Sequence, residues 1–227
     1  MADSHVTESH STVAVAFLRA RRLRGPMSRL ATARGIYRRW LAVYLPAATV
    51  VLAGSALLGF LLGSAVPVAA LPTPQGTGDP GFLPPLTTVD LAVNNLVAMC
   101  VLLLGAVSLG LVTLAGLVVN GLLIGVIVGI AVQRLDAVVV FVLIAPHGVL
   151  EIPALLVAAT VGLRFAWLTV RYTRGLEEEL VTRRDLREAG VLVAAASLLI
   201  LVAAYIEANV TLALAERIAG GELSGVR

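Results

Sequence analysis

The fold is decided by residues 91–132, which spell LAVNNLVAMCVLLLGAVSLGLVTLAGLVVNGLLIGVIVGIAV. This stretch contains no charged residue and is about twice as long as one membrane-spanning helix, which needs about 20 apolar residues. We therefore predict two helices that cross a bilayer and are joined by a tight turn near Leu111–Gly116. One long helix is the alternative, and it would place the arginines of 171–188 on the side of the membrane opposite to the N-terminal arginines.

The composition of the whole chain also indicates a membrane protein. Of the 227 residues, 59% are hydrophobic and 14% are charged, and the mean hydropathy is +0.95. Soluble domains have about 45–50% apolar and about 25% charged residues, and a chain of this length has too little interior to bury the excess. We therefore predict an all-α, polytopic transmembrane helix bundle of about five spans.

The remaining spans lie on either side of the opening stretch. They are predicted from about Trp40 to Val66, from Ala137 to about Val170, and from about Ala189 to Ala215. Pro146, His147 and Gly148 interrupt the fourth of the five spans, and a proline removes a backbone donor and clashes with the preceding turn. We therefore predict a helix that is broken at Pro146–Gly148.

The arginines predict the orientation. All 17 basic residues are Arg, against 14 acidic residues; eight arginines lie in 19–39 and five in 171–188, whereas 67–90 has none. Because loops rich in positive charge stay in the cytoplasm, we expect a cytoplasmic N-terminus in the cell (plasma) membrane. The chain is then divided into a basic cytoplasmic segment 1–39, a transmembrane domain 40–215 with an outer loop 67–90 and a cytoplasmic loop 171–188, and a tail 216–227.

Single residues add three expectations. Trp40 and Trp167 each adjoin an arginine cluster, as anchors at the membrane interface do. Cys100 is the only cysteine, which excludes an internal disulfide framework and a multi-cysteine metal site, and we expect it to be buried.

The basic stretch is too long to be the n-region of a cleaved signal peptide, and residues 1–15 are expected to form a disordered tail.

Small residues form two stripes at four-residue spacing: Ser55, Gly59 and Gly63 in the first span, and Gly121, Gly125 and Gly129 in the third. Such stripes let helix backbones approach closely within a membrane. They indicate packing inside the bundle, and a homo-oligomer seam is the alternative.

Hydrophilic side chains at membrane depth are the candidate site. They are His147, Glu151, Glu207, Asn94, Asn95 and Asn120. An ionisable group in hydrocarbon costs about 2.5 kcal/mol or more, so such groups normally face the bundle interior and pair with one another. Residues four apart share one face of a helix, which places His147 and Glu151 together. We expect all six side chains to form one polar cluster in the outer half of the bundle.

The fourth span contains the string PHGVLEIPA (146–154), followed by Gly162-Leu163-Arg164. The pattern His-Gly-x-x-Glu-x-Pro-Ala closely resembles the signature of the stage II sporulation protein M family of integral membrane proteins. Matches to Asn94-Asn95-Leu96, Asn120-Gly121 and Ile206-Glu207-Ala208 support the resemblance, which covers roughly residues 27–215. It implies a polytopic helical protein. In endospore-forming bacteria the namesake joins a peptidoglycan-hydrolysing complex at the engulfing septal membrane as a membrane scaffold, and many relatives belong to archaea and other cells that form no spores.

Three functions are compatible with the polar cluster. The first is a non-enzymatic scaffold of an envelope-associated complex, in which the cluster fixes helix packing. The second is a transporter or lipid-handling permease with a protonatable His–Glu site, because broken helices with polar residues form many transport sites. The third is an intramembrane metal-dependent hydrolase, weakened because a catalytic zinc site usually needs three protein ligands and the predicted spans contain one histidine.

We expect the first function: no enzyme activity, no cofactor and no metal. The expected partners are the lipid bilayer and other membrane or envelope proteins, and not nucleic acid, because topology accounts for the arginines.

Overall fold

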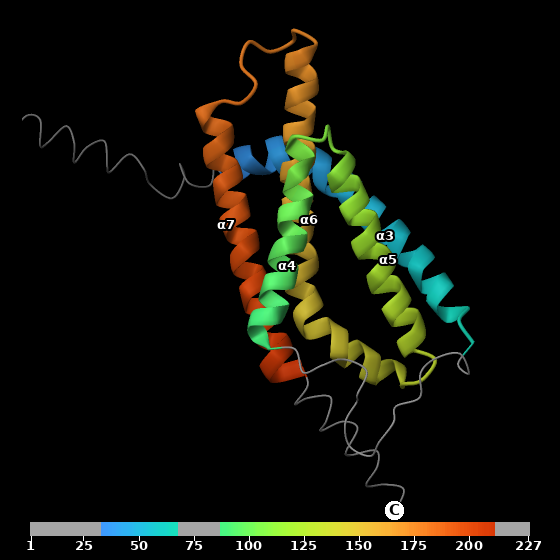
Figure 1. Ribbon diagram of the computed structural model, residues 1–227. Coiled ribbons are helices and arrows are strands. Elements are labelled where there is room, and N and C mark those ends of the chain that lie inside the picture. Colours follow the sequence, from blue (N-terminus) through green and yellow to red (C-terminus); the bar gives the residue numbers. More distant parts are fainter. Residues whose placement is uncertain (1–32, 68–86, 212–227) are drawn as a thin grey trace, which may run out of the picture.

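The computed structural model describes residues 33–67 and 87–211, and the regular elements in these ranges are helices (Figure 1). In chain order they are the π-helical turn η1 (Tyr37–Leu41), α3 (Ala42–Ser64), α4 (Thr88–Leu103), the 3₁₀ turn η3 (Leu104–Ala106), α5 (Leu111–Ala131), α6 (Ala137–Thr173), α7 (Arg183–Ile206) and the π-helical turn η4 (Glu207–Thr211). Five helices in these ranges are long and apolar enough to cross a membrane. The chain is an all-α, multi-pass membrane protein, as predicted. The expected tails 1–15 and 216–227 and most of loop 67–90 lie outside the described residues.

The helices alternate in direction between two ends of the bundle. The α4–α5 turn, the end of α6 and the start of α7 lie at one end, and the start of α6 and the end of α7 lie at the other (Figure 1). The first is called the arginine end, because Arg171 and Arg183 lie there, and the second the opposite end. This alternation matches the predicted five crossings of the membrane. The alternative prediction, one long helix over 91–132, is wrong.

The turn between α4 and α5 comes earlier than predicted. It occupies residues 104–110 instead of Leu111–Gly116, because the chain reverses at Leu109 (φ 51°) and Gly110 (φ 88°). Positive φ is a conformation that glycine adopts without steric cost. Gly116 lies instead inside α5, where an added Cβ would stand 3.0 Å from the Leu102 side chain. The α4 helix also presents Cys100 on its exposed face, so the expectation of a buried thiol is wrong.

Helix α6 lies at the centre of the bundle. Half of its span is buried, against a third or less of each of the other four spans. Its small residues Ala154, Ala158 and Ala159 are fully buried and belong to one core cluster with residues of the four other long helices, such as Ala48 and Leu102. Small side chains along α6 therefore allow its neighbours to approach it closely.

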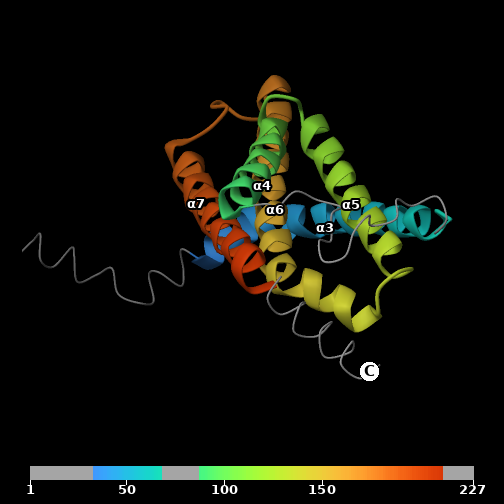
Figure 2. The same cartoon turned by 60° about the horizontal axis from the view of Figure 1, so that its bottom comes forward.

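The predicted break in α6 takes the form of a bend. The helix is continuous from Ala137 to Thr173 and contains Pro146 and Pro153. Figures 1 and 2 both show that its first turns run across the opposite end before the rest of the helix crosses the bundle. Pro146 lacks the N–H that would bond to the carbonyl of Val142, and its ring pushes that carbonyl away, which is the usual cause of such a bend.

The two small-residue stripes pack against each other within the chain. A Cβ on Gly59 would stand 2.3 Å from the carbonyl oxygen of Leu122 in α5, and a Cβ on Gly125 would stand 2.0 Å from that of Ala56 in α3. The Ser55 hydroxyl also donates to the Leu117 carbonyl at 3.5 Å. The stripes therefore build the contact between α3 and α5. Association of two chains stays a prediction, and it would have to use other surfaces.

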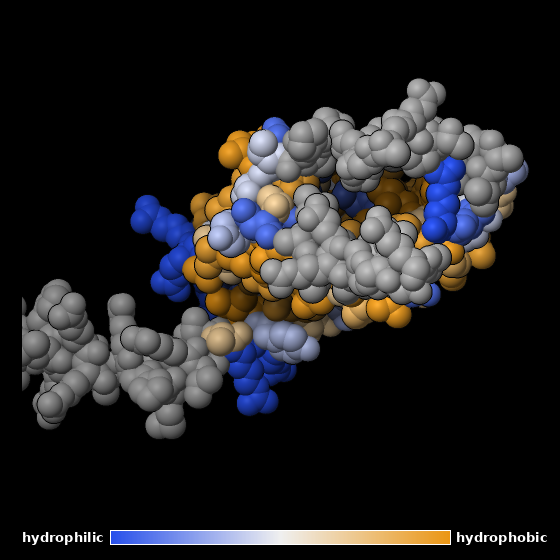
Figure 3. All heavy atoms as spheres, turned by 90° about the horizontal axis from the view of Figure 1, so that it is seen from below, coloured by the Kyte–Doolittle hydropathy of each residue, from blue (hydrophilic) through white to orange (hydrophobic). Residues whose placement is uncertain are grey.

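The outer faces of the bundle are apolar. Large hydrophobic side chains such as Val50, Leu61, Leu123 and Leu198 are more than half exposed. Seen from the opposite end, hydrophobic residues cover most of the coloured surface (Figure 3). In a bilayer these faces contact lipid instead of water, so the outer surface of the spans can be apolar.

Candidate functional site

Two polar clusters lie inside the bundle, one near each end. The first, called the carboxylate cluster, consists of Glu151, Glu207, Asn94 and Asn95. Asn95 in α4 is 7% exposed, and its side chain lies near Glu151 in α6. Asn94 donates from Nδ2 to Oδ1 of Asn95 at 3.3 Å, and Glu207 in η4 is close enough for electrostatic repulsion with Glu151. Three elements far apart in the sequence therefore meet at these four residues.

The neighbouring turn η4 is tied to α4 by a further hydrogen bond. Asn209 donates from Nδ2 to Oγ1 of Thr88 at 3.3 Å and to the Tyr205 carbonyl at 2.9 Å. Thr88 is the first residue of α4, whose start is capped by a reciprocal pair of hydrogen bonds between Thr87 and Asp90. The cap satisfies the first backbone N–H groups of α4 and so stabilises the start of the helix that carries Asn94 and Asn95.

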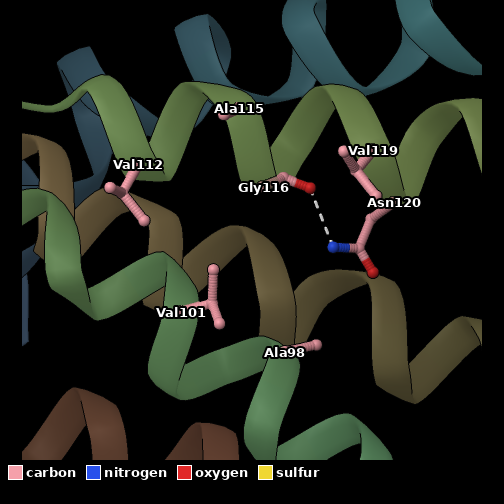
Figure 4. A pocket seen from close by; sticks show the side chains of 7 residues that line it. All are labelled: Ala98, Val101, Val112, Ala115, Gly116, Val119 and Asn120. Atoms are coloured by element: carbon pink, nitrogen blue, oxygen red, sulfur yellow. Dashed lines mark hydrogen bonds between the residues drawn. The ribbon is translucent and has the colours of Figure 1, made fainter.

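Two of the six predicted residues are not placed in the carboxylate cluster. Asn120 donates from Nδ2 to the Gly116 carbonyl of its own helix at 2.8 Å and lines an apolar groove of about 350 Å³ between α4 and α5 (Figure 4). The side-chain amide of an asparagine in an apolar helix can donate to a backbone carbonyl one turn earlier in the same helix. The predicted depth of Asn120 in the membrane therefore did not identify its hydrogen-bond partner. His147 lies in α6, but its side chain lies outside the described residues, so its part in the cluster stays a prediction.

The carboxylate cluster has limited chemical capacity. Within residues 33–67 and 87–211, no group of three or more His, Cys, Asp or Glu side chains could hold a metal ion. Two facing carboxylates repel each other when both are charged. The residues that the structure brings together thus join α4, α6 and η4.

The second cluster was not predicted from the sequence. It is called the arginine network and consists of Arg39, Trp40, Arg164, Arg184, Asp185 and Glu188. At its centre the Glu188 carboxylate, 3% exposed, accepts hydrogen bonds from Trp40 Nε1 at 2.9 Å, Arg39 Nε at 3.1 Å and Arg184 Nε at 3.0 Å. A second hydrogen bond from Arg39 Nη2 makes the Arg39–Glu188 pair bidentate. The network therefore joins η1 to α7.

Arg164 connects the same network to α6. Its Nη2 donates to Asp185 at 3.1 Å and its Nη1 to the Arg39 carbonyl at 2.8 Å. Its guanidinium lies 4.6 Å from the centre of the Trp40 ring, and Phe165 meets that ring edge-on at 5.4 Å. Cation–π and charge-assisted contacts are strongest away from water, so Arg164 fixes α6 against both η1 and α7.

The position of Trp40 corrects an expectation. We expected both tryptophans to be anchors at the membrane interface, but Trp40 is fully buried in the protein; Trp167 is 46% exposed, and its place at the interface stays a prediction. The π-helical turn Tyr37–Leu41 changes the helical register just before α3 and coincides with Trp40 facing the interior. One signal in the sequence could have identified the network: Arg164 is the single charged residue between Glu151 and Arg171, and a lone arginine within a span needs a partner.

Comparison with known proteins gives one family. Residues 48–212 match the family model of stage II sporulation protein M. An uncharacterized protein of Methanocaldococcus jannaschii is 31% identical over 123 residues, which cover 54% of this chain and 69% of that protein. No solved structure matches the chain significantly.

Proposed function

Because the chain belongs to the stage II sporulation protein M family, we propose that it is a non-enzymatic membrane component that holds other envelope proteins together in the plasma membrane. The observation that carries this proposal is the use of its intramembrane polar groups. The arginine network joins η1, α6 and α7, and the carboxylate cluster joins α4, α6 and η4. The hydrogen bonds of the arginine network run between side chains and backbone of the protein itself, which stiffens the contact between these elements.

The exposed part of the arginine end is where we place partner binding. The last turns of α6 and the loop after them extend beyond the α4–α5 turn (Figure 1). Leu176 and Leu180 in this loop are exposed beside exposed glutamates such as Glu178. The centre of a protein interface is more apolar than its rim and poor in charged residues, so we place these two leucines at the centre of the contact and the glutamates at its rim. By the charge rule for membrane loops, this end and the N-terminus face the cytoplasm.

The test separates a scaffold from a transporter. The tagged full-length chain is purified from host membranes, its co-purifying envelope proteins are identified, and it is reconstituted for proton and solute flux. We expect Leu176→Asp with Leu180→Asp to release partners that the wild type retains, and Glu178→Gln, the matched loop control, to retain them. We expect no flux with either the wild type or Glu151→Gln. A flux that Glu151→Gln abolishes while all partners remain bound would refute the proposal in favour of a transporter.

A further inference from the structure

The groove between α4 and α5 contains an amide near the middle of a membrane span. Asn120 lies nine residues after Leu111, the start of α5, and eleven before Ala131, its end, and Figure 4 shows its side chain pointing into the groove. One N–H of its Nδ2 donates to the Gly116 carbonyl of the same helix, whereas its Oδ1 accepts no hydrogen bond from the residues that the structure describes. We propose that this groove is the interface of a symmetric homodimer, in which Asn120 of each copy hydrogen-bonds to Asn120 of the other.

The free half of the Asn120 amide favours a protein partner over lipid. Lipid tails offer neither donors nor acceptors, so an amide that faces them leaves hydrogen bonds unmade at a cost in free energy. Asparagine side chains inside membranes therefore form hydrogen bonds to other helices. The other residues that line the groove carry no polar side chain: Ala98, Val101, Val112, Ala115, Gly116 and Val119. The missing side-chain partner must therefore come from a second molecule.

A second copy of the chain supplies the required groups at the required depth. Two copies that insert in the same orientation are related by a twofold axis along the membrane normal, so each residue lies at the same depth in both. Asn120 therefore meets Asn120 where α5 faces α5 across this axis. An amide is complementary to itself, because the free N–H of each copy can donate to the Oδ1 of the other. A different protein would need both a donor and an acceptor at this depth.

The surface around Asn120 allows a second helix to approach closely. Ala98, Ala115 and Gly116 line the groove with small side chains, as at other close contacts between membrane helices. Beside the groove, α5 carries a row of exposed residues at four-residue spacing: Leu111, Ala115, Val119, Leu123 and Ile127. Such a row forms a ridge that packs into the groove of a facing helix. The stripe of α5 that includes Gly125 already packs against α3, so the ridge is the face left for a second copy.

The experiment measures association of the full chain in vesicles that contain no other protein. Glu178, exposed in the loop after α6, is replaced by Cys in a Cys100→Ser background and labelled with a donor or an acceptor dye. The two labelled forms are reconstituted together, and energy transfer is followed as the protein-to-lipid ratio falls. We expect a dimer whose dissociation constant rises about tenfold in Asn120→Leu, the scale of two hydrogen bonds between membrane helices. Asn120→Gln retains an amide and should retain the dimer.

Matched variants locate the interface. Ala115→Phe, on the ridge of α5, should abolish energy transfer, whereas Ala53→Phe, exposed on α3, should preserve it. In the Cys100→Ser background, oxidation with copper phenanthroline should join two copies of Val119→Cys, whereas Leu198→Cys, exposed on α7, should stay unjoined.

Two results would overturn the dimer. Absence of energy transfer for the wild type would assign the groove to a different molecule, and a dissociation constant that Asn120→Leu leaves unchanged would remove the role of the amide. Because the amide bonds only to its own helix among the described residues, Asn120→Leu decides the result even if Ala115→Phe fails to fold. The measurement involves no envelope protein, so its outcome is independent of the proposed scaffold function.

Discussion

Replacing Glu188 by Gln tests whether the arginine network holds the bundle together. Gln keeps the size of the side chain and one acceptor oxygen, so Trp40 retains a neutral partner, but the charge that binds Arg39 and Arg184 is lost. A hydrogen bond to a charged group contributes about 1.5–3 kcal/mol. Arg184 is 62% exposed, so water compensates for most of its loss, whereas Arg39 is only 30% exposed. We therefore expect the free energy of unfolding to fall by about 2–3 kcal/mol, mainly through Arg39.

Glu188→Ala should cost more than Glu188→Gln. It also leaves the fully buried indole N–H of Trp40 without an acceptor, which adds about 1–3 kcal/mol. The total destabilisation is then about 3–6 kcal/mol, close to the cost of removing one partner of a buried ion pair. The ranking Ala worse than Gln follows from the geometry of a single hydrogen bond.

The assay is unfolding of the detergent-solubilised chain by added SDS, followed by far-ultraviolet circular dichroism. Glu178→Gln is the matched control, because it changes the same charge in the exposed loop and should alter stability by about 0.5 kcal/mol or less. Arg39→Gln combined with Glu188→Gln should destabilise less than the sum of the two single changes by about 1–3 kcal/mol. A Glu188→Gln variant as stable as Glu178→Gln would show that the network adds no stability, and strictly additive changes would show that Arg39 and Glu188 do not stabilise each other.

Three other perturbations test the fold. Gly125→Val places a Cβ about where the Ala56 carbonyl lies and should lower the free energy of unfolding by about 3 kcal/mol or more; Gly54→Val, which meets nothing within 4 Å, is its control in the same SDS titration. Gly110→Ala forces a Cβ into positive φ and should cost about 1–2 kcal/mol by the same measurement, and an unchanged midpoint would contradict the turn. In a Cys100→Ser background, Glu178→Cys should react with a membrane-impermeant maleimide from the cytoplasmic side and Leu135→Cys from the other, and labelling of both from one side would contradict the topology.

The number of spans could be predicted because it depends on local composition, but their limits only in part: the fourth span begins at Gly148 instead of Ala137, and the last helix begins at Arg183 instead of Ala189. A run of about 20 apolar residues must cross the bilayer whatever surrounds it, and arginines between runs mark the ends. The position of the α4–α5 turn could not be predicted, because Gly105, Gly110 and Gly116 all interrupt one apolar stretch. Only Gly110 adopts positive φ; Gly105 and Gly116 pack against side chains of neighbouring segments instead.

The candidate sites were predictable to different degrees. Glu151, Glu207, Asn94 and Asn95 were expected together because polar groups in hydrocarbon need partners, and the structure brings them near one another. Asn120 illustrates the limit of this rule, since its own helix supplies its acceptor. The burial of Trp40 illustrates a second limit of prediction from sequence, because the π-helical turn that precedes α3 has no local sequence signature.

By itself, the amino-acid sequence determined that this protein is embedded in a lipid bilayer, how often it crosses the bilayer, and which side chains cost free energy there. The reason is that the free energy of transfer into hydrocarbon is a property of each residue and its near neighbours. Only the tertiary structure decided which groups meet. Glu188 pairs with Arg39 and Trp40, and the small-residue stripe of α3 packs against that of α5. Those choices depend on the rotation and crossing of helices that are far apart in the chain, and these are set by packing of all the helices together.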